Sequence, residues 1–238
     1  ITYMKAQHKL DILAFGAHPD DVEFGCGGLL VKATKRGQIV GIADLTQAEL
    51  ATDGDVMVRK KEAARAAETL GLTIRQNLGL PDGFLSHAQS AHRRIVTIVR
   101  KYRPEMVLLP YYSDRHPDHE AASQLIRHAL FLAELKKYET HQAPHHPRYV
   151  LFYMMRQEFQ PTIIVDITDE WPKKVESLSA YKSQFSPKEH QRRVIGHRDE
   201  MFSFLEARGR NYGSLINADF GEPYLSLHPV GVDDPFQL

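Results

Sequence analysis

Short apolar runs alternate with amphipathic segments along most of the chain. The runs cover residues 10–16, 38–45, 73–79, 105–109, 149–155 and 162–167. Helical spacing of apolar residues covers 24–37, 56–70, 88–102 and 121–137, and we also expect helix from 168 to about 208. Strands that alternate with helices build βαβ units, and continuous apolar runs are typical of buried parallel strands. The pattern therefore predicts an α/β fold with a mostly parallel sheet and helices on both faces.

The same pattern indicates one domain, over residues 10–225. We expect irregular tails at 1–9 and 226–238, and irregular structure from Gly209 onward, where Gly and Pro are frequent. The segment 141–147 holds three histidines and two prolines and is predicted to be a solvated loop. Because the chain starts with Ile1, we expect Met4 to be the natural first residue.

Composition narrows the class of protein. A single cysteine cannot form an internal disulfide, which excludes a disulfide-rich secreted module. No stretch approaches the ~18 consecutive apolar residues of a transmembrane helix, so we expect no membrane partner and a cytoplasmic location. The 30 basic and 30 acidic residues balance, which argues against a nucleic-acid partner. A globular intracellular protein is the remaining expectation.

Two tetrapeptides share one pattern of imidazole and carboxylate side chains, HPDD at 18–21 and HPDH at 116–119. Each follows a predicted strand and precedes a predicted helix, and residues three apart in a first helical turn lie on the same side. In open α/β sheets, ligands bind outside the carboxyl ends of the strands. The two motifs therefore converge if the strands that precede them, the first and the fourth, are neighbours.

The residue types in these motifs suit a metal ion. Imidazole and carboxylate groups bind zinc, and a catalytic zinc keeps three protein ligands with one position open to water. The motifs hold more ligands and acids than a structural site needs, which favours catalysis. Taken alone, either motif is also typical of a helix N-terminus, where an aspartate caps the first turn.

The segments Ala17–Glu23 and Asp114–His119 resemble the two signatures of the PIG-L/LmbE-like zinc-dependent N-deacetylases. Residues 15–16, 44–46, 80–82 and 181–185 are similar to the bacillithiol-biosynthesis branch, whose members deacetylate N-acetylglucosaminyl-malate. The resemblance extends from about residue 10 to about 225. It implies a Rossmann-like fold and an amide hydrolase that releases acetate.

The resemblance also implies roles for residues of the first motif and for His119 of the second. His18, Asp21 and His119 would hold one Zn²⁺ per chain, although other divalent metals suit these ligands as well. Asp20 would be the general base that takes a proton from the attacking water. Cys26 is a further candidate ligand, but a small buried residue is the simpler expectation.

Further candidates lie around the second motif and in the helix after the second strand. By the resemblance, His116 would stabilise the oxyanion as a protonated imidazole, held by Asp118. Either Asp20 or His116 would return the proton to the leaving amine. Arg59 would face the substrate, although a solvated surface arginine fits as well. We expect Asp114 to pair with Arg115 at the surface, at a position two before His116 where some relatives carry a tyrosine.

The predicted function is zinc-dependent deacetylation of an N-acetylglucosaminyl compound, with N-acetylglucosaminyl-malate first and diacetylchitobiose as the alternative. An anionic malate group would need a cation near the zinc, and Arg59 is the candidate. Relatives commonly form homo-oligomers, so we expect one here.

Two other classes of protein are considered. A nucleotide-binding Rossmann protein would use the glycines at 25, 27 and 28, but the acidic motif at 18–23 occupies the turn where the phosphate-binding glycines belong. A non-catalytic zinc module predicts no acids beyond the ligands, and Asp20 and Asp118 count against it.

Overall fold

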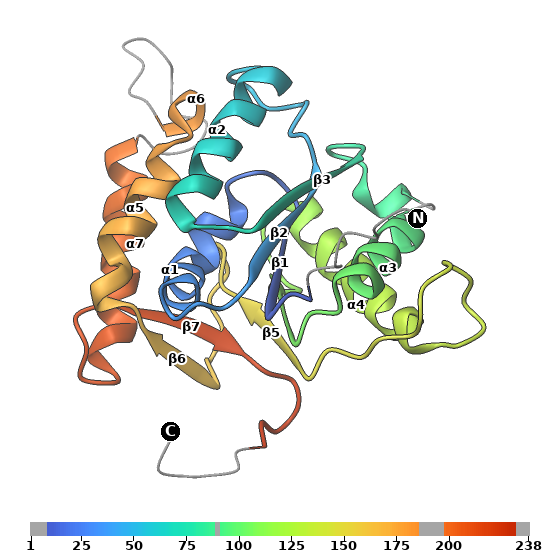
Figure 1. Ribbon diagram of the computed structural model, residues 1–238. Coiled ribbons are helices and arrows are strands. Elements are labelled where there is room, and N and C mark those ends of the chain that lie inside the picture. The colour runs from blue at the N-terminus through green and yellow to red at the C-terminus, as the bar shows by residue number, and fades with distance from the viewer. Residues whose placement is uncertain (1–8, 89–90, 186–197, 232–238) are drawn as a thin grey trace.

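The computed structural model describes residues 9–88, 91–185 and 198–231, and its centre is one seven-stranded sheet (Figure 1). The strand order is β3-β2-β1-β4-β5-β7-β6. The strands are β1 (Ile12–Gly16), β2 (Val40–Thr46), β3 (Ile74–Leu80), β4 (Met106–Pro110), β5 (Tyr149–Tyr153), β6 (Ile163–Asp166) and β7 (Gly221–Leu225). The first five strands in this order pair in parallel, whereas β7 is antiparallel to both of its neighbours. The expected α/β class with a mostly parallel sheet is confirmed.

Helices cover both faces of this sheet, as expected. They are α1 (Asp21–Lys35), α2 (Val56–Leu70), α3 (Ala91–Tyr102), α4 (Pro117–Glu134), α5 (Trp171–Ser179), α6 (Lys182–Phe185) and α7 (Arg198–Ser214), with 3₁₀ turns at Leu85–His87 and Thr168–Glu170. One core joins α3 and α4 to alternate residues of the strands, such as Phe15 and Val107. The other joins α1, α5 and α7 to the opposite residues, such as Ala14 and Leu108. Figure 1 shows α3 and α4 on one side and α1, α2, α5 and α7 on the other.

The expectation of irregular structure after Gly209 is wrong. Helix α7 continues to Ser214, and β7 lies inside the sheet between β5 and β6. The β7 sequence holds a glutamate and a proline, residues that are depleted in strands, so its pattern gave no strand signal. Two helices also start earlier than expected: α1 begins at Asp21 and α4 at Pro117, so their first turns include motif residues.

The order of the central strands places the two motifs together. β1 pairs with β2 on one side and with β4 on the other, so the strand order reverses between β1 and β4. Such a switch point opens a crevice at the carboxyl ends of the two strands. The HPDD motif follows β1 and the HPDH motif follows β4. The condition for convergence, that the first and fourth strands are neighbours, is met.

The glycine-rich segment 25–28 lies within α1 and allows the helix to approach the sheet closely. A Cβ at Gly25 would lie 2.1 Å from the Tyr153 ring, and one at Gly28 would lie 2.7 Å from Ile167. The helix is kinked at Cys26, whose φ is −142°. These glycines therefore serve packing, and they do not form the strand-to-helix turn that a nucleotide-binding fingerprint requires.

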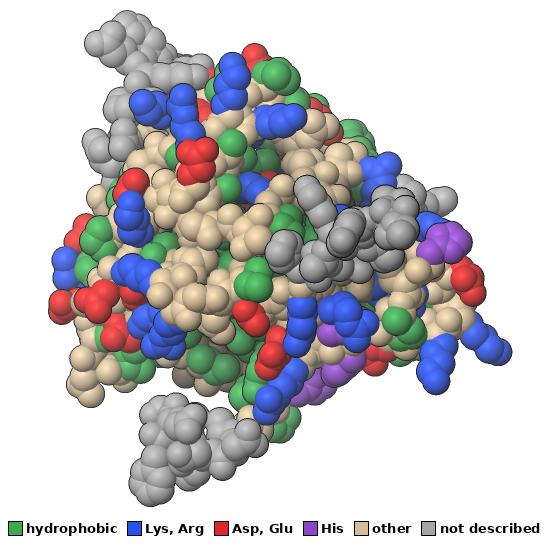
Figure 2. Space-filling view, viewed as in Figure 1, with side chains coloured by type: hydrophobic (Ala, Val, Ile, Leu, Met, Phe, Trp, Pro, Cys, Tyr) green, Lys and Arg blue, Asp and Glu red, His purple; other side chains and the backbone are tan. Residues whose placement is uncertain are grey.

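Among the described residues, no helix has the length and apolar character needed to cross a membrane. Basic and acidic side chains are interspersed over the face drawn in Figure 2. Segment 141–147 forms a loop without helix or strand, as predicted. Of the tails expected at 1–9 and 226–238, residues 226–231 form neither helix nor strand, whereas 1–8, with the Met4 start, and 232–238 lie outside the described residues.

Candidate metal centre

The HPDD motif forms a sharp turn between β1 and α1. Asp21 is the first residue of α1, and its Oδ2 accepts a hydrogen bond of 2.8 Å from the amide of His18. Asp20 lies between them with a φ of 121°, a conformation that is costly for a residue with a Cβ. The hydrogen bond from the His18 amide fixes the Asp21 carboxylate, so the turn holds the side chains of His18 and Asp21 close together.

The HPDH motif begins α4. His116 is the N-cap of α4, and Pro117 is the first residue of the helix. Nδ1 of His116 accepts a hydrogen bond from the Asp118 amide. The rings of His116 and His119 stack with centroids 4.6 Å apart. The expectation that residues three apart in this turn lie on one side therefore holds for this pair.

Three side chains from the two motifs form a compact donor set. One donor atom from each of His18, Asp21 and His119 lies within 4.8 Å of the others. Asp21 Oδ1 is 3.3 Å from His119 Nε2, and Asp21 Oδ2 is 3.5 Å from His18 Nδ1. All three residues are buried. Two imidazoles and one carboxylate in this arrangement fit a divalent metal ion that keeps a position for water or substrate.

The electrostatics of the donor set also indicate a cation. Burial lowers the pKa of His119, but the Asp21 and Asp114 carboxylates more than offset this and raise it to about 9. For His18, burial also lowers the pKa, yet Asp118, Asp21 and Asp82 raise it well above its usual range. Carboxylates that hold protons on buried imidazoles are equally able to stabilise a metal ion there.

The buried Arg59 and the partly buried Asp20 form an ion pair beside the donor set. Arg59 Nη1 is 2.7 Å from Asp20 Oδ2 and also donates to the Pro19 carbonyl oxygen at 3.1 Å. Burial raises the pKa of Asp20 to about 6, against the opposing effect of the Arg59 guanidinium. Arg59 is only 5% exposed. It is therefore not a solvated surface residue, and two hydrogen bonds of its Nη1 go to the turn of the first motif.

The contact between His116 and Asp118 differs from the expected one. The Asp118 amide donates to His116 Nδ1, whereas the Asp118 carboxylate accepts from the Gly83 amide and lies 3.5 Å from His18 Nε2. Burial and the nearby His119 and His18 lower the pKa of His116, although Asp118 raises it. Because Nδ1 accepts a hydrogen bond, the ring proton of a neutral His116 lies on Nε2.

Two further aspartates contact the imidazoles. Asp82, in the loop after β3, lies 2.9 Å from His18 Nε2, and Asp114 lies 3.0 Å from His119 Nδ1. The expected surface pair of Asp114 with Arg115 is wrong, because Asp114 is buried against His119. The sequence signals for Asp82 are its place just after a strand that ends at the same edge of the sheet and its position in segment 80–82, which carries part of the family resemblance.

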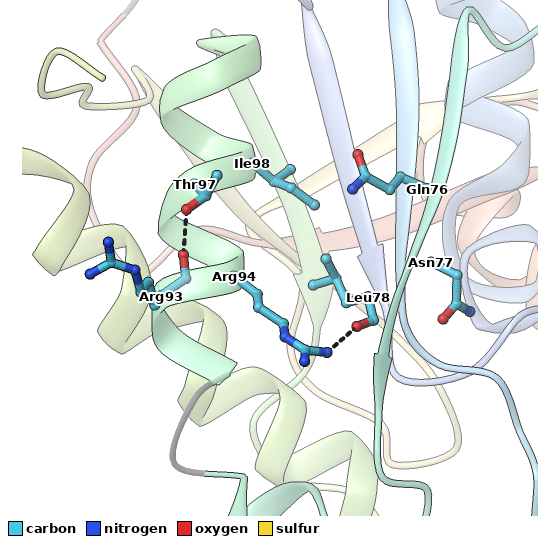
Figure 3. A pocket seen from close by; sticks show the side chains of 7 residues that line it. All are labelled: Gln76, Asn77, Leu78, Arg93, Arg94, Thr97 and Ile98. Carbon is cyan, nitrogen blue, oxygen red and sulfur yellow. Dashed lines mark hydrogen bonds between the residues drawn. The ribbon is translucent and has the colours of Figure 1, made fainter. Parts of the chain in front are cut away.

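Other candidate features lie elsewhere. Cys26 is buried within α1, burial raises the pKa of its thiol well above the usual range, and it is absent from the donor sets found among the described residues. A hollow of about 400 Å³ lies between β3 and α3 (Figure 3). Its lining residues are Gln76, Asn77, Leu78, Arg93, Arg94, Thr97 and Ile98, none of which belongs to the two motifs.

A buried His–Asp–His donor set beside a carboxylate, at the switch point of an α/β sheet, defines the class of a metal-dependent hydrolase. Comparisons with known proteins agree. Residues 13–130 match the family described as "PIG-L: GlcNAc-PI de-N-acetylase". The chain belongs to this PIG-L/LmbE-like family of deacetylases.

Relatives in sequence and structure cover most of the chain. Diacetylchitobiose deacetylase from Thermococcus kodakarensis is 33% identical over 191 residues, which are 73% of this chain and 70% of the relative. A probable N-acetyl-alpha-D-glucosaminyl L-malate deacetylase 2 from Bacillus anthracis is 26% identical over 76% of this chain and 84% of its own. The crystal structure of a conserved protein from Thermus thermophilus superposes with a TM-score of 0.87, at 36% identity, over 95% of this chain and 98% of that one.

Proposed function

We propose that the protein removes the acetyl group from N-acetylglucosaminyl compounds, with one zinc ion held by His18, Asp21 and His119. The observation that carries this proposal is the buried donor set, whose atoms lie within 4.8 Å of one another beside the paired Asp20. The membership in a deacetylase family supports the same chemistry. When bound, zinc would polarise the acetyl carbonyl and make water a stronger nucleophile at neutral pH.

Asp20 is the proposed general base. Its carboxylate takes a proton from the attacking water, and a pKa of about 6 keeps it ionised yet basic near neutral pH. Arg59 holds Oδ2 of Asp20 and the preceding carbonyl oxygen, so the strained turn keeps one orientation. The water oxygen then forms a bond to the acetyl carbon.

His116 is the proposed donor to the oxygen that becomes negative during this attack. Since Nδ1 of His116 accepts the Asp118 amide, the neutral ring carries its proton on Nε2 and can donate it in a hydrogen bond to that oxygen. The carbon–nitrogen bond then breaks, and acetate and a free amine are released. The amine takes up the proton that Asp20 removed from the water.

For the substrate, we propose neutral N-acetylglucosamine glycosides such as diacetylchitobiose ahead of N-acetylglucosaminyl-malate. In support of this order, the relative named diacetylchitobiose deacetylase is 33% identical, whereas the probable malate deacetylase is 26% identical. Arg59, the candidate cation for a malate group, is buried and hydrogen-bonded to Asp20 and to the Pro19 carbonyl oxygen.

The test is a substrate panel with the purified protein, first freed of metal and then loaded with zinc. We expect zinc-dependent release of equal amounts of acetate and amine from N-acetylglucosamine compounds, with an N-acetylated amino acid as the control. Diacetylchitobiose is expected to exceed N-acetylglucosaminyl-malate in kcat/KM. The absence of acetate from every sugar in the panel would overturn the proposal.

Arg59→Met sharpens the question of the substrate. Because Arg59 acts through Asp20, its loss is expected to lower kcat for the neutral and the malate-bearing substrate alike, within about threefold of each other. A selective rise in KM for the malate compound would restore Arg59 as a substrate-binding residue and favour the malate branch.

A homo-oligomer and a cytoplasmic location stay predictions from the sequence. Size-exclusion chromatography with light scattering measures the oligomeric state directly. Fractionation of cells that express the protein tests the location.

A further inference from the structure

We propose that Asp82 and Asp114 are positioning residues that hold the two imidazole ligands in opposite tautomers, so that His18 binds the metal through Nδ1 and His119 through Nε2. The inference rests on the proposed metal-dependent function. A carboxylate that accepts the second N–H of a ligand histidine fixes the ring and strengthens it as a donor.

The contacts of His18 assign its two ring nitrogens. Nδ1 faces Asp21, at 3.5 Å from Oδ2, and this is the side of the donor set. Nε2 lies 2.9 Å from Oδ1 of Asp82. Because a carboxylate only accepts hydrogen bonds, a neutral His18 keeps its proton on Nε2, and its Nδ1 then turns a lone pair toward the metal position.

The contacts of His119 give the reverse assignment. Nε2 lies 3.3 Å from Oδ1 of Asp21, whereas Nδ1 lies 3.0 Å from Oδ1 of Asp114. A neutral His119 therefore keeps its proton on Nδ1, and its Nε2 then has the free lone pair. The two ligands come from different motifs and use different nitrogens, and each has its own aspartate.

Both aspartates are fixed by backbone from distant parts of the chain. Oδ2 of Asp82 accepts the Leu50 amide at 2.9 Å, from the loop after β2. Oδ2 of Asp114 accepts the amides of Arg156 and Gln157 at 2.9 and 3.2 Å, from the segment after β5. The two aspartates are 7% and 9% exposed, so water does not compete freely for them. Two loops thereby determine how the ligand rings are oriented.

A different use of Asp82 has to be separated by experiment. His18, Asp82 and Asp118 also offer donor atoms within 4.8 Å of one another, which is enough for a second ion. That ion would need Nε2 of His18, the atom already hydrogen-bonded to Asp82. If the first metal occupies Nδ1, a second on Nε2 requires loss of the last ring proton, so the hydrogen bond is the favoured state.

The experiment measures zinc affinity of the metal-free full chain by competition with a chromophoric chelator, in the absence of substrate. Asp82→Asn and Asp114→Asn keep the size of the side chain but remove its charge. We expect each to weaken zinc binding about 10- to 100-fold. The matched controls are Glu49→Gln and Glu120→Gln, since these acids hold the amides of Asp82 and Asp114 through hydrogen bonds that involve no imidazole. Their affinities are expected to stay within about threefold of the parent.

A cobalt titration and a thermal scan accompany the affinity measurement. The visible spectrum of bound Co²⁺ is expected to change in both aspartate variants, while the metal-free proteins still unfold in one cooperative transition, as the controls do. Unchanged zinc affinity in both variants, or equal losses in the controls, would overturn the proposal. Two zinc equivalents per chain, one of them lost in Asp82→Asn, would replace it with a second metal site.

A measurement on the unmutated protein guards against variants that do not fold. With ¹⁵N-labelled histidine and bound zinc, nitrogen shifts are expected to show one ligand metallated at Nδ1 and the other at Nε2. Metallation of both rings at Nε2 would contradict the assignment. Because these readouts use the metal alone, they can succeed while every acetylated substrate fails, and the reverse is also possible.

Discussion

Two buried clusters of charged side chains contact the kinked helix α1, one around the kink at Cys26 and the other at the N-terminus of the helix, and they balance their charge in different ways. In the first, Lys174 donates to Glu222 and to the carbonyl oxygen of Phe24, while Glu222 accepts the amides of Gly28 and Leu29. This cluster contains its own cation and joins α1, α5 and β7. It has the partners that a structural network needs.

The metal centre is built from the same kinds of atoms, but within the described residues its one arginine, Arg59, pairs with Asp20 and not with the carboxylates around the imidazoles. The carboxylates of Asp21, Asp82, Asp114 and Asp118 all lie within hydrogen-bond or ion-pair distance of His18 or His119. Imidazoles neutralise these acids only by taking up protons, and the raised pKa of His119 reflects this. The first cluster is thus complete in the folded chain, whereas the second is completed by a ligand.

Of the changes proposed to separate the two clusters, removal of a ligand histidine is expected to have the largest effect on zinc content and activity. We expect His119→Ala to lose stoichiometric zinc and to lower kcat/KM at least about 10³-fold, since metal catalysis is worth several kcal/mol. The measurements are metal content after dialysis and acetate release. His145→Ala is the control, because His145 contacts the Pro104 carbonyl oxygen in another loop. A His119→Ala protein that still binds one zinc would show that the ligand assignment is wrong.

Replacement of the proposed base separates chemistry from metal binding within the same cluster. We expect Asp20→Asn to lower kcat by roughly 10²–10⁴-fold, the usual contribution of a general base, while zinc content stays at one per chain. Kinetics and metal analysis on one preparation check both parts. Asp166→Asn, an exposed aspartate bonded to Thr168, is the control. Loss of zinc equal to that of the ligand variant would make Asp20 a ligand.

The strands that support the two clusters differ in how well the sequence predicts them. Strands β1 and β4 are continuous apolar runs, so their positions were predictable, and the motifs that follow them indicated the donor set in advance. Strand β7 was not predictable, because Glu222 and Pro223 interrupt its pattern and its place depends on pairing with β6. The glutamate that weakens the strand signal is the residue that completes the Lys174 cluster.

The partners of the imidazoles were hidden for a different physical reason. Asp82 is 64 residues from His18, and the hydrogen bond between them depends on how two loops fold against each other. Asp114 is near His119 in sequence, but an aspartate followed by an arginine has the pattern of a surface pair. Its burial follows from the backbone amides at 156 and 157, which no local pattern relates to residue 114. Spacing within a motif predicts ligands, whereas the groups that orient them come from tertiary structure.

Disruption of the first cluster is expected to affect folding and leave the metal centre intact. Lys174→Met leaves Glu222 buried without its cation, which costs roughly 3–5 kcal/mol of unfolding free energy. Denaturant unfolding measures this loss, and chelator competition is expected to give a zinc affinity within about threefold of the parent. Lys173→Met is the neighbouring control, because its partner Glu176 is exposed. If Lys174→Met lowered zinc affinity as far as Asp82→Asn or Asp114→Asn, the two clusters would be energetically coupled, and the distinction drawn between them would be wrong.

The smallest expected effect is a pH dependence of zinc binding at the metal centre. We expect no such dependence in the stability contribution of the Lys174–Glu222 cluster. The pKa of His119 in the folded metal-free protein is raised to about 9, so a proton occupies the ring at pH 7 and at pH 8 and must leave when zinc binds. Apparent zinc affinity is therefore expected to fall at least about tenfold from pH 8 to pH 7, about 1.4 kcal/mol. Chelator competition at the two pH values checks this.

The sign of the effect on stability is opposite for the metal-free and the zinc-loaded protein. A folded pKa above the unfolded value of about 6.5 stabilises the metal-free fold below pH 6.5, and this contribution is lost as pH rises through 9. The rise in unfolding midpoint caused by a fixed excess of zinc should therefore be larger at pH 8 than at pH 7. The shift caused by Lys174→Met should be the same at both. An unchanged zinc effect between these values would mean that His119 is already neutral, and that the carboxylates around it are balanced within the chain after all.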